Sequence, residues 1–167
     1  MKVTKEKKAQ QIKGIEEVIE SEELETNEEG RVCSLTVTED KRIATGGEDG
    51  NISISSYDVN ERTWKREIHE EKAHDSHIFS LCPLNGNRLL SGGDEGSIKV
   101  WSLSDDEPTL TKEIKAHTDI VRKVIPLSKE RFASCSADGT VKIWKDDKTY
   151  ECISTLEHDS LVRSILQ

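Results

Sequence analysis

The chain has 167 residues, 34% of them charged, and a net charge of −9. The acidic balance argues against a nucleic-acid-binding surface, and no apolar run approaches the ~18 residues that a membrane-spanning helix needs. The basic N-terminus is not followed by the apolar segment of a signal peptide. We therefore expect a cytosolic protein, with the nucleus as the alternative, that associates with neither membranes nor nucleic acids.

Residues 1–30 form a charged N-terminal segment that differs in composition from the rest of the chain. Five Lys fall within its first 13 residues and eight Glu within its last 17. Ile12, Ile15 and Ile19 recur at helical spacing, so residues 1–30 are expected to be either a charged tail or an amphipathic helix over 8–25 that packs on the first sheet. A further alternative is an extended segment that pairs with a sheet edge.

Three copies of one β-hairpin pattern follow, at 42–55, 88–101 and 131–144. In each copy a short strand ends in small residues, an acidic residue and Gly make a tight turn, and a second strand alternates apolar and polar side chains. His74 and His117 precede the second and third copies at a fixed distance, and Glu28 stands at that place before the first. The turn glycines lie 46 and 43 residues apart, at Gly50, Gly96 and Gly139.

A repeat with a leading His, an Asp-Gly turn and a closing Trp resembles the WD40 family, which builds β-propellers from blades of four antiparallel strands. The resemblance implies an all-β fold over 31–167, with three blades and the first strand of a fourth at 161–166. A typical propeller of this family has about seven blades, so the chain would be about half a propeller. The predicted strands lie near 32–37, 42–47, 51–57 and 63–69, then 78–83, 88–92, 97–102 and 109–114, then 121–126, 131–135, 140–145 and 149–156.

The resemblance also implies a structural role for the polar residues of the repeat. In the family, a His, a Ser, an Asp and a Trp are linked by hydrogen bonds within a blade, which satisfies polar groups that are buried there. The matching residues of the third copy are His117, Ser134, Asp138 and Trp144. The second copy has His74, Ser91 and Trp101, with Glu95 in place of the Asp. The first copy keeps Thr45 and Asp49, and Ser55 replaces its Trp.

Alternation of apolar residues along the predicted strands indicates which side chains form the core. The predicted core residues are Val32, Leu35, Val37, Ile43, Ile52 and Ile54, then Ile78, Leu81, Leu89, Ile98 and Val100, then Val121, Val124, Phe132, Val141 and Ile143.

Three other chemistries have weaker support in the sequence. A Ser-His-Asp hydrolase would need a nucleophile elbow and an oxyanion hole, and neither is evident. A phosphate loop would need a helix after Gly46-Gly47 or Gly92-Gly93, where a strand is predicted instead. The histidines and the four cysteines match no zinc spacing, so we expect reduced cysteines, no metal and no cofactor.

Two sets of charged residues are candidates for binding a partner. One set forms an acidic rim at the hairpin turns and favours a basic peptide; it consists of Glu48, Asp49, Asp94, Glu95 and Asp138, with Asp75, Asp119 and Asp159 beside them. The other set is Arg122 and Arg163, which are expected on innermost strands and could line a central pore. The arginines that recur just before the second strand of each copy are expected to be solvated; they are Arg42, Arg88 and Arg131.

These features favour a non-enzymatic scaffold or adaptor that binds other proteins. The alternatives are the substrate-recognition module of a ubiquitin ligase and the regulatory WD40 portion of a larger enzyme. Three blades cannot close a ring and would leave apolar faces and strand edges bare. We therefore expect a homo-oligomer, or a hetero-partner that completes the propeller.

Overall fold

The computed structural model describes residues 30–70, 72–104 and 108–166. Within these ranges the chain forms three four-stranded antiparallel sheets, and each sheet uses four consecutive strands. Blade one contains β1 (Val32–Val37), β2 (Ile43–Gly47), β3 (Ile52–Asp58) and β4 (Thr63–Glu70). Blade two contains β5 (Ile78–Leu84), β6 (Arg88–Gly93), β7 (Ser97–Ser102) and β8 (Thr109–Lys115). Blade three contains β9 (Val121–Ser128), β10 (Arg131–Ser136), β11 (Thr140–Lys145) and β12 (Cys152–Glu157).

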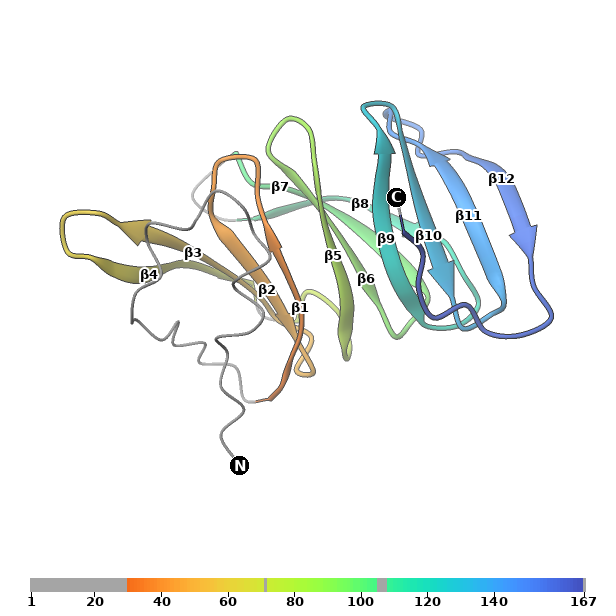
Figure 1. Cartoon of the computed structure of the whole chain (residues 1–167), viewed down its shortest axis with the longest axis horizontal. Coiled ribbons are helices and arrows are strands. Elements are labelled where there is room, and N and C mark those ends of the chain that lie inside the picture. The colour runs from red at the N-terminus through yellow and green to blue at the C-terminus, as the bar shows by residue number, and fades with distance from the viewer. Residues whose placement is uncertain (1–29, 71, 105–107, 167) are drawn as a thin grey trace.

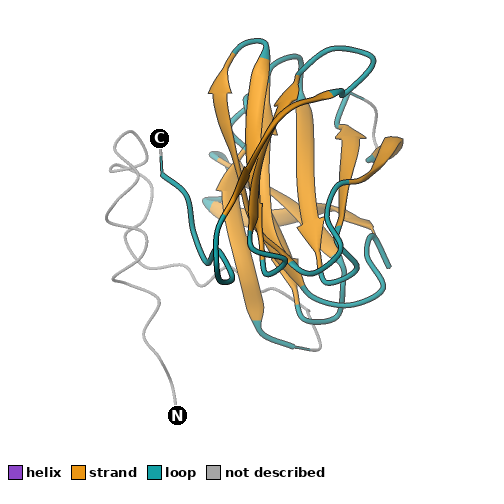
Figure 2. Cartoon of the chain, turned by 90° about the vertical axis from the view of Figure 1, so that its right-hand side faces the viewer, coloured by secondary structure: helices purple, strands orange, loops and turns teal. Residues whose placement is uncertain are grey.

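The three sheets stand side by side like the blades of a fan (Figure 1). The first strand of each sheet is innermost, and β5 packs against both β1 and β9. Figure 2 shows the same arrangement from the side, with strands throughout and loops at both ends of the sheets. No helix occurs in the described ranges, and hence none that is long and apolar enough to cross a membrane. This is the predicted all-β architecture.

The turn between the second and third strands of each blade depends on a glycine. Gly50, Gly96 and Gly139 have φ angles of 79°, 76° and 83°, a left-handed conformation that glycine adopts without a steric penalty. The carbonyl of each turn glycine accepts a hydrogen bond from the N–H of the His that leads into the next blade. These bonds measure 3.0 Å to His74, 2.9 Å to His117 and 2.8 Å to His158. The turn of one blade is thereby tied to the loop of the next.

The apolar core lies between the blades. The cluster between blades one and two contains Ala44, Ile52, Ile54, Ala73, Ile78, Leu81, Leu89, Trp101 and Leu103. The cluster between blades two and three contains Cys82, Leu84, Leu90, Ile98, Val100, Ile114, Ala116, Val121, Val124, Phe132 and Trp144. Gly46 and Gly92 allow the next inner strand to approach, because a Cβ there would lie 2.8 Å from Ile78 Cγ2 and 2.6 Å from Val121 Cγ1. The glycine pairs therefore serve close packing.

In the part of the chain that the structure describes, blades one and three each have one face without a neighbouring blade. Leu35 of blade one is 50% exposed, whereas the equivalent Leu81 of blade two is 7% exposed. Leu156 of blade three is 51% exposed, whereas the equivalent Ile114 is 8% exposed. The prediction that all the alternating apolar residues are core was wrong at these end faces. Val32 and Leu35 are exposed there, and Val141 and Ile143 are only partly buried.

Two predicted elements near the C-terminus differ from the structure. β12 begins at Cys152 rather than near residue 149. Asp147 Oδ1 accepts hydrogen bonds from the N–H groups of Thr149 and Tyr150, and the positive φ of Tyr150 (51°) closes a turn there. Residues 161–166 do not form the predicted strand, although the Val162 N–H donates to the carbonyl of Ser136, at the end of β10, at 3.0 Å. The predicted N-terminal helix over 8–25 lies outside the described residues.

Candidate functional site

Four polar side chains of blade three form a continuous hydrogen-bonded chain. His117 Nδ1 lies 2.9 Å from Asp138 Oδ2, and His117 Nε2 lies 2.7 Å from Ser134 Oγ. The Trp144 indole N–H donates to the same Ser134 Oγ at 2.9 Å. The structure thus brings together the four residues that the family resemblance singled out, from the loop before β9, from β10, from the turn and from β11.

The protonation states follow from the partners. Desolvation lowers the pKa of His117, so its ring is neutral at pH 7. Nδ1–H then donates to Asp138, Nε2 accepts from the Ser134 hydroxyl, and the hydroxyl oxygen accepts from the Trp144 indole. Burial opposes ionisation of Asp138, but hydrogen bonds from Thr140, His117 and the Thr118 N–H outweigh it and lower its pKa to about 2. Every donor in this chain therefore has an acceptor.

Ser134 is fully buried and its hydroxyl is engaged on both sides. Nucleophilic attack would require a substrate carbonyl to reach the Ser134 hydroxyl oxygen, and burial leaves no route to that oxygen. The arrangement supports the packing of three strands rather than acyl transfer.

Blade two forms the same network of hydrogen-bonded side chains, with a Glu in place of the Asp. His74 Nε2 lies 2.6 Å from Ser91 Oγ, which accepts from the Trp101 indole N–H at 2.8 Å. His74 Nδ1 is bonded to Glu95 Oε1, which also accepts from the Ser97 hydroxyl at 2.9 Å. Burial opposes ionisation of Glu95, but hydrogen bonds, first that of His74, lower its pKa to about 2. Glu95 therefore occupies the place of the Asp.

Blade one has no His at the repeat position of His117 and no Trp at that of Trp144. Thr45 and Ser55 are buried in β2 and β3, and Asp49 serves its own turn. Its carboxylate accepts from the N–H of Asn51 at 3.0 Å and from the Asn51 side-chain amide at 2.7 Å.

The family comparison agrees with this repeated geometry. Residues 65–102 and 108–145 match the family model described as "WD domain, G-beta repeat". These two segments are WD40 repeats. The matched segments run from the outer strand of one blade to the third strand of the next, so each contains one His-to-Trp chain.

Solved WD40 propellers share the fold of this chain. The crystal structure of RRP9 WD40 repeats has a TM-score of 0.69 and 21% identity, over 81% of this chain and 42% of that one. A chain of the mitotic checkpoint complex crystal structure has a TM-score of 0.70 and 23% identity, over 86% of this chain and 44% of that one. The WD40 β-propeller domain of Doa1 has a TM-score of 0.66 and 19% identity, over 81% and 44%. This chain spans less than half the length of these solved chains. No curated protein sequence matches it.

Propellers of WD40 repeats generally mediate protein–protein interactions. In the described ranges no group of three or more His, Cys, Asp or Glu side chains could hold a metal ion.

The predicted acidic rim residues of the WD40 repeats mostly have partners within the chain. Glu48 accepts from Arg31 Nε at 2.8 Å, and its Oε1 lies 3.7 Å from His77 Nε2. His77 Nδ1 lies 3.0 Å from Asp94 Oδ2, so this imidazole stands between acids of two blades. Asp49, Glu95 and Asp138 are engaged as described above. Their carboxylates supply negative charge to the rim, but their oxygens are largely occupied.

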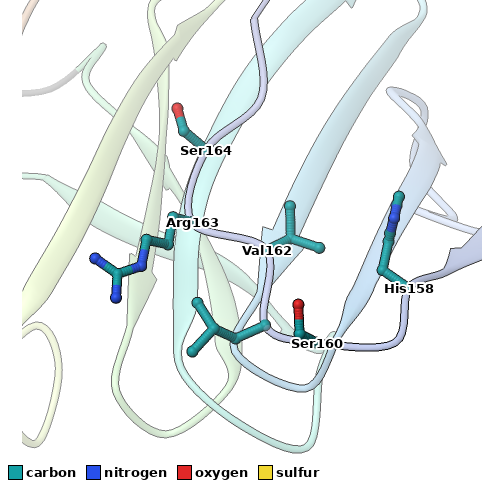
Figure 3. Close-up of a pocket in the computed structure, with 6 residues that line it drawn as sticks. His158, Ser160, Val162, Arg163 and Ser164 are labelled. Carbon is teal, nitrogen blue, oxygen red and sulfur yellow. The ribbon is translucent and has the colours of Figure 1, made fainter.

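The two predicted pore arginines of the WD40 chain have different surroundings. The Arg122 guanidinium lies 4.9 Å from the centroid of the Phe79 ring, which itself stacks on His77 at 5.5 Å. Arg163 is exposed and helps to line a shallow hollow with neighbours from 158–164. Figure 3 shows its side chain extending away from His158. Arg122 is not among the residues that line this hollow.

Sequence analysis missed the role of the arginines before each second strand. Arg88 reaches from β6 to blade three and donates to both carboxylate oxygens of Asp146, at 2.7 and 3.0 Å. The Asp146 side chain is fully buried. Arg42 similarly reaches blade two, where Nη2 donates to the Leu103 carbonyl at 3.0 Å. Arg131, at the equivalent place in blade three, is exposed. The recurrence at one repeat position was the signal for this inter-blade contact.

Proposed function

We propose that this WD40 chain is a protein-interaction scaffold that binds a basic segment of a partner across its acidic rim. The observation that carries the proposal is a row of exposed carboxylates in the loops after the leading histidines. Asp75, Asp119 and Asp159 each lie next to a hairpin turn, because these loops are hydrogen-bonded to the turn glycines. They offer oxygen acceptors at the spacing of the blades.

The carboxylates of the hydrogen-bonded networks add to the negative potential at the rim. Glu95 and Asp138 have pKa values of about 2, so both stay ionised at neutral pH even though their oxygens are used within the blade. A Lys or Arg side chain would meet the exposed acids directly and the engaged acids through the longer-range potential. The solved WD40 chains share only the fold with this one, so the choice of a basic partner rests on this rim.

The test uses a Lys- and Arg-rich synthetic peptide as the probe and measures its affinity at several salt concentrations. The Asp75→Asn/Asp119→Asn variant should bind the peptide about tenfold more weakly and with a smaller salt dependence. The matched control is Glu61→Gln/Glu130→Gln, which removes two exposed charges from turns that join other strands. Equal losses in both variants, or binding that does not weaken with salt, would contradict the proposal.

A further inference from the structure

His77 lies between carboxylates of two neighbouring blades, at the rim that carries the hairpin turns. Its Nδ1 lies 3.0 Å from Asp94 Oδ2, in the β6–β7 turn of blade two. Its Nε2 lies 3.7 Å from Glu48 Oε1, in the β2–β3 turn of blade one. The two ring nitrogens of one imidazole therefore face acids of different blades, and the cluster belongs to the interface between blades one and two.

The neighbours of this ring fix its position. The imidazole stacks on the Phe79 ring, with centroids 5.5 Å apart and an angle of 4° between the planes. Nδ1 also lies 2.8 Å from the Ser76 hydroxyl oxygen, which can either donate or accept. Packing and hydrogen bonds together keep the nitrogens directed at the two acids. The His77 side chain is 37% exposed, so protons from solvent can reach it.

The charge state of the ring decides how many of these contacts it can make. A neutral imidazole carries one N–H, so in either tautomer its other nitrogen directs a lone pair toward a carboxylate. The imidazolium carries two N–H groups, and it can donate to Asp94 while it attracts Glu48. Imidazole groups change charge between pH 5 and 8. The favourable contacts between Glu48, His77 and Asp94 are therefore more numerous in a mildly acidic medium.

Two arginines lie near the cluster and keep their charge over this pH range. Arg31 donates from Nε to Glu48 Oε1 at 2.8 Å, and its own side chain is mostly exposed. The Arg122 guanidinium lies 4.9 Å from the centroid of the Phe79 ring on which His77 stacks. Both cations are present whether or not His77 is protonated, so neither one changes the charge of the rim as the pH changes.

Other titratable side chains occupy the same loops and turns. Asp75 lies two residues before His77, and Glu95 follows Asp94. Carboxylic acids ordinarily ionise below pH 5, and Glu95 has a pKa of about 2. His74 is fully buried, with its ring nitrogens bonded to Glu95 and Ser91. His77 is therefore the exposed group of this cluster that can change its charge between pH 5 and 8.

We propose that protonation of His77 links the turns of blades one and two and lowers the affinity of the acidic rim for a basic segment of a partner. The effect on the partner rests on the proposed function of the rim. When His77 is neutral, the charges of Glu48 and Asp94 contribute to the attraction of a Lys or Arg side chain. When His77 is protonated, the imidazolium satisfies both acids and adds a positive charge beside them. A basic partner then binds more weakly in a mildly acidic medium than at neutral pH and above.

The first test measures the binding of an acetylated Lys- and Arg-rich peptide to the full chain by fluorescence anisotropy, at pH 5.5 and 8 and at one ionic strength. We expect the wild type to bind about fivefold more weakly at pH 5.5 than at pH 8. His77→Gln keeps an uncharged polar side chain at both pH values, so it should bind like the wild type at pH 8 and lose most of the pH dependence. The matched control is His158→Gln, which removes an exposed His beside Asp159 and should keep the pH dependence. Equal affinities of the wild type at the two pH values, or a His77→Gln chain that retains the difference, would overturn the proposal.

Denaturant unfolding tests the link between the two blades without any ligand. Because only the protonated ring can contact both acids favourably, His77→Gln should lower the folding equilibrium constant roughly threefold more at pH 5.5 than at pH 8. Buried His117 is present in both chains, so its contribution cancels in the comparison. An equal loss at the two pH values would overturn the link. A peptide that binds at neither pH would contradict the proposed function of the rim and the binding effect that rests on it, while the unfolding comparison still decides whether the link exists.

Discussion

Gly93 lies directly beside Glu95 Oε2, so that a Cβ at position 93 would stand 2.6 Å from that oxygen. The same Cβ would stand 2.3 Å from His74 Nδ1. Blade three carries Ser136 at the position of Gly93 and the shorter Asp138 at the position of Glu95. The missing side chain at 93 therefore makes room for the extra methylene of Glu95, and the two differences between the blades are coupled.

This coupling can be measured. Gly93→Ser should lower the free energy of unfolding by about 1–3 kcal/mol, because it forces atoms into an occupied space. Gly93→Ser/Glu95→Asp restores the pairing of blade three and should be less destabilised than the sum of the single variants by roughly 1–2 kcal/mol. Urea unfolding of the wild type, the two single variants and the double variant completes the double-mutant cycle. Additive effects would show that position 93 and the acid are independent.

Trp144→Phe tests the hydrogen-bonded chain of blade three. Phe fills most of the indole volume but leaves buried Ser134 Oγ without its donor, so we expect a loss of about 1–3 kcal/mol in unfolding free energy. Trp64→Phe is the matched control, since Trp64 is only partly buried in an edge-to-face contact with Tyr57. Equal losses in the two variants would mean that ring volume, and not the hydrogen bond, is what matters.

The ion pair between Arg88 and Asp146 should contribute strongly to the free energy of unfolding, because the Asp146 side chain is fully buried. Arg88→Ala leaves a fully buried carboxylate without its cation, and we expect a loss of about 3–5 kcal/mol in the free energy of unfolding. Arg131→Ala, at the equivalent but exposed position, should cost within about 0.5 kcal/mol in dilute solution. Denaturant midpoints compare the two variants directly. A small effect at both positions would show that solvent reaches Asp146.

Acid should destabilise the fold in two stages. Desolvation lowers the pKa of His117 below its ordinary value of 6.5, and hydrogen bonds that outweigh burial lower that of Asp138 from 3.8 to about 2. In each case the unfolded state binds more protons than the folded state as the pH falls. The free energy of unfolding should therefore fall below pH 6.5 and again between about pH 4 and 2.

Urea unfolding at a series of pH values checks both stages. Asp138→Asn should reduce the lower stage, and the remainder should reflect Glu95, whose pKa is also lowered to about 2. A free energy of unfolding that does not vary between pH 7 and 3 would contradict the assignment.

The hairpins were predictable because turn glycines and alternating strands are local signals. The hydrogen bonds from His to Trp were predicted from the resemblance of the repeat to the WD40 family. Leu35 and Leu156 show what such signals do not contain. Their alternation is the same as that of Leu81 and Ile114, and only the absence of a neighbouring blade exposes them. The recurrence of Arg at one repeat position indicated a shared role for Arg88. Its partner Asp146 lies 58 positions away in another blade, so the pairing itself could not be predicted from a local pattern. The space for the Glu95 side chain depends on the absence of a side chain at Gly93. This dependence becomes visible only when the distance between the two residues is known.

The bonds from each turn glycine to the following His also bear on how the molecule opens. Because each blade contacts only its immediate neighbours, unfolding should begin at the two ends and advance inward one blade at a time. Blade two is covered on both faces and tied at both turns, from Gly50 to His74 and from Gly96 to His117. Its β6 amide protons should exchange with solvent most slowly. Blade two, which is packed on both faces, should therefore have the greatest local stability of the three described blades.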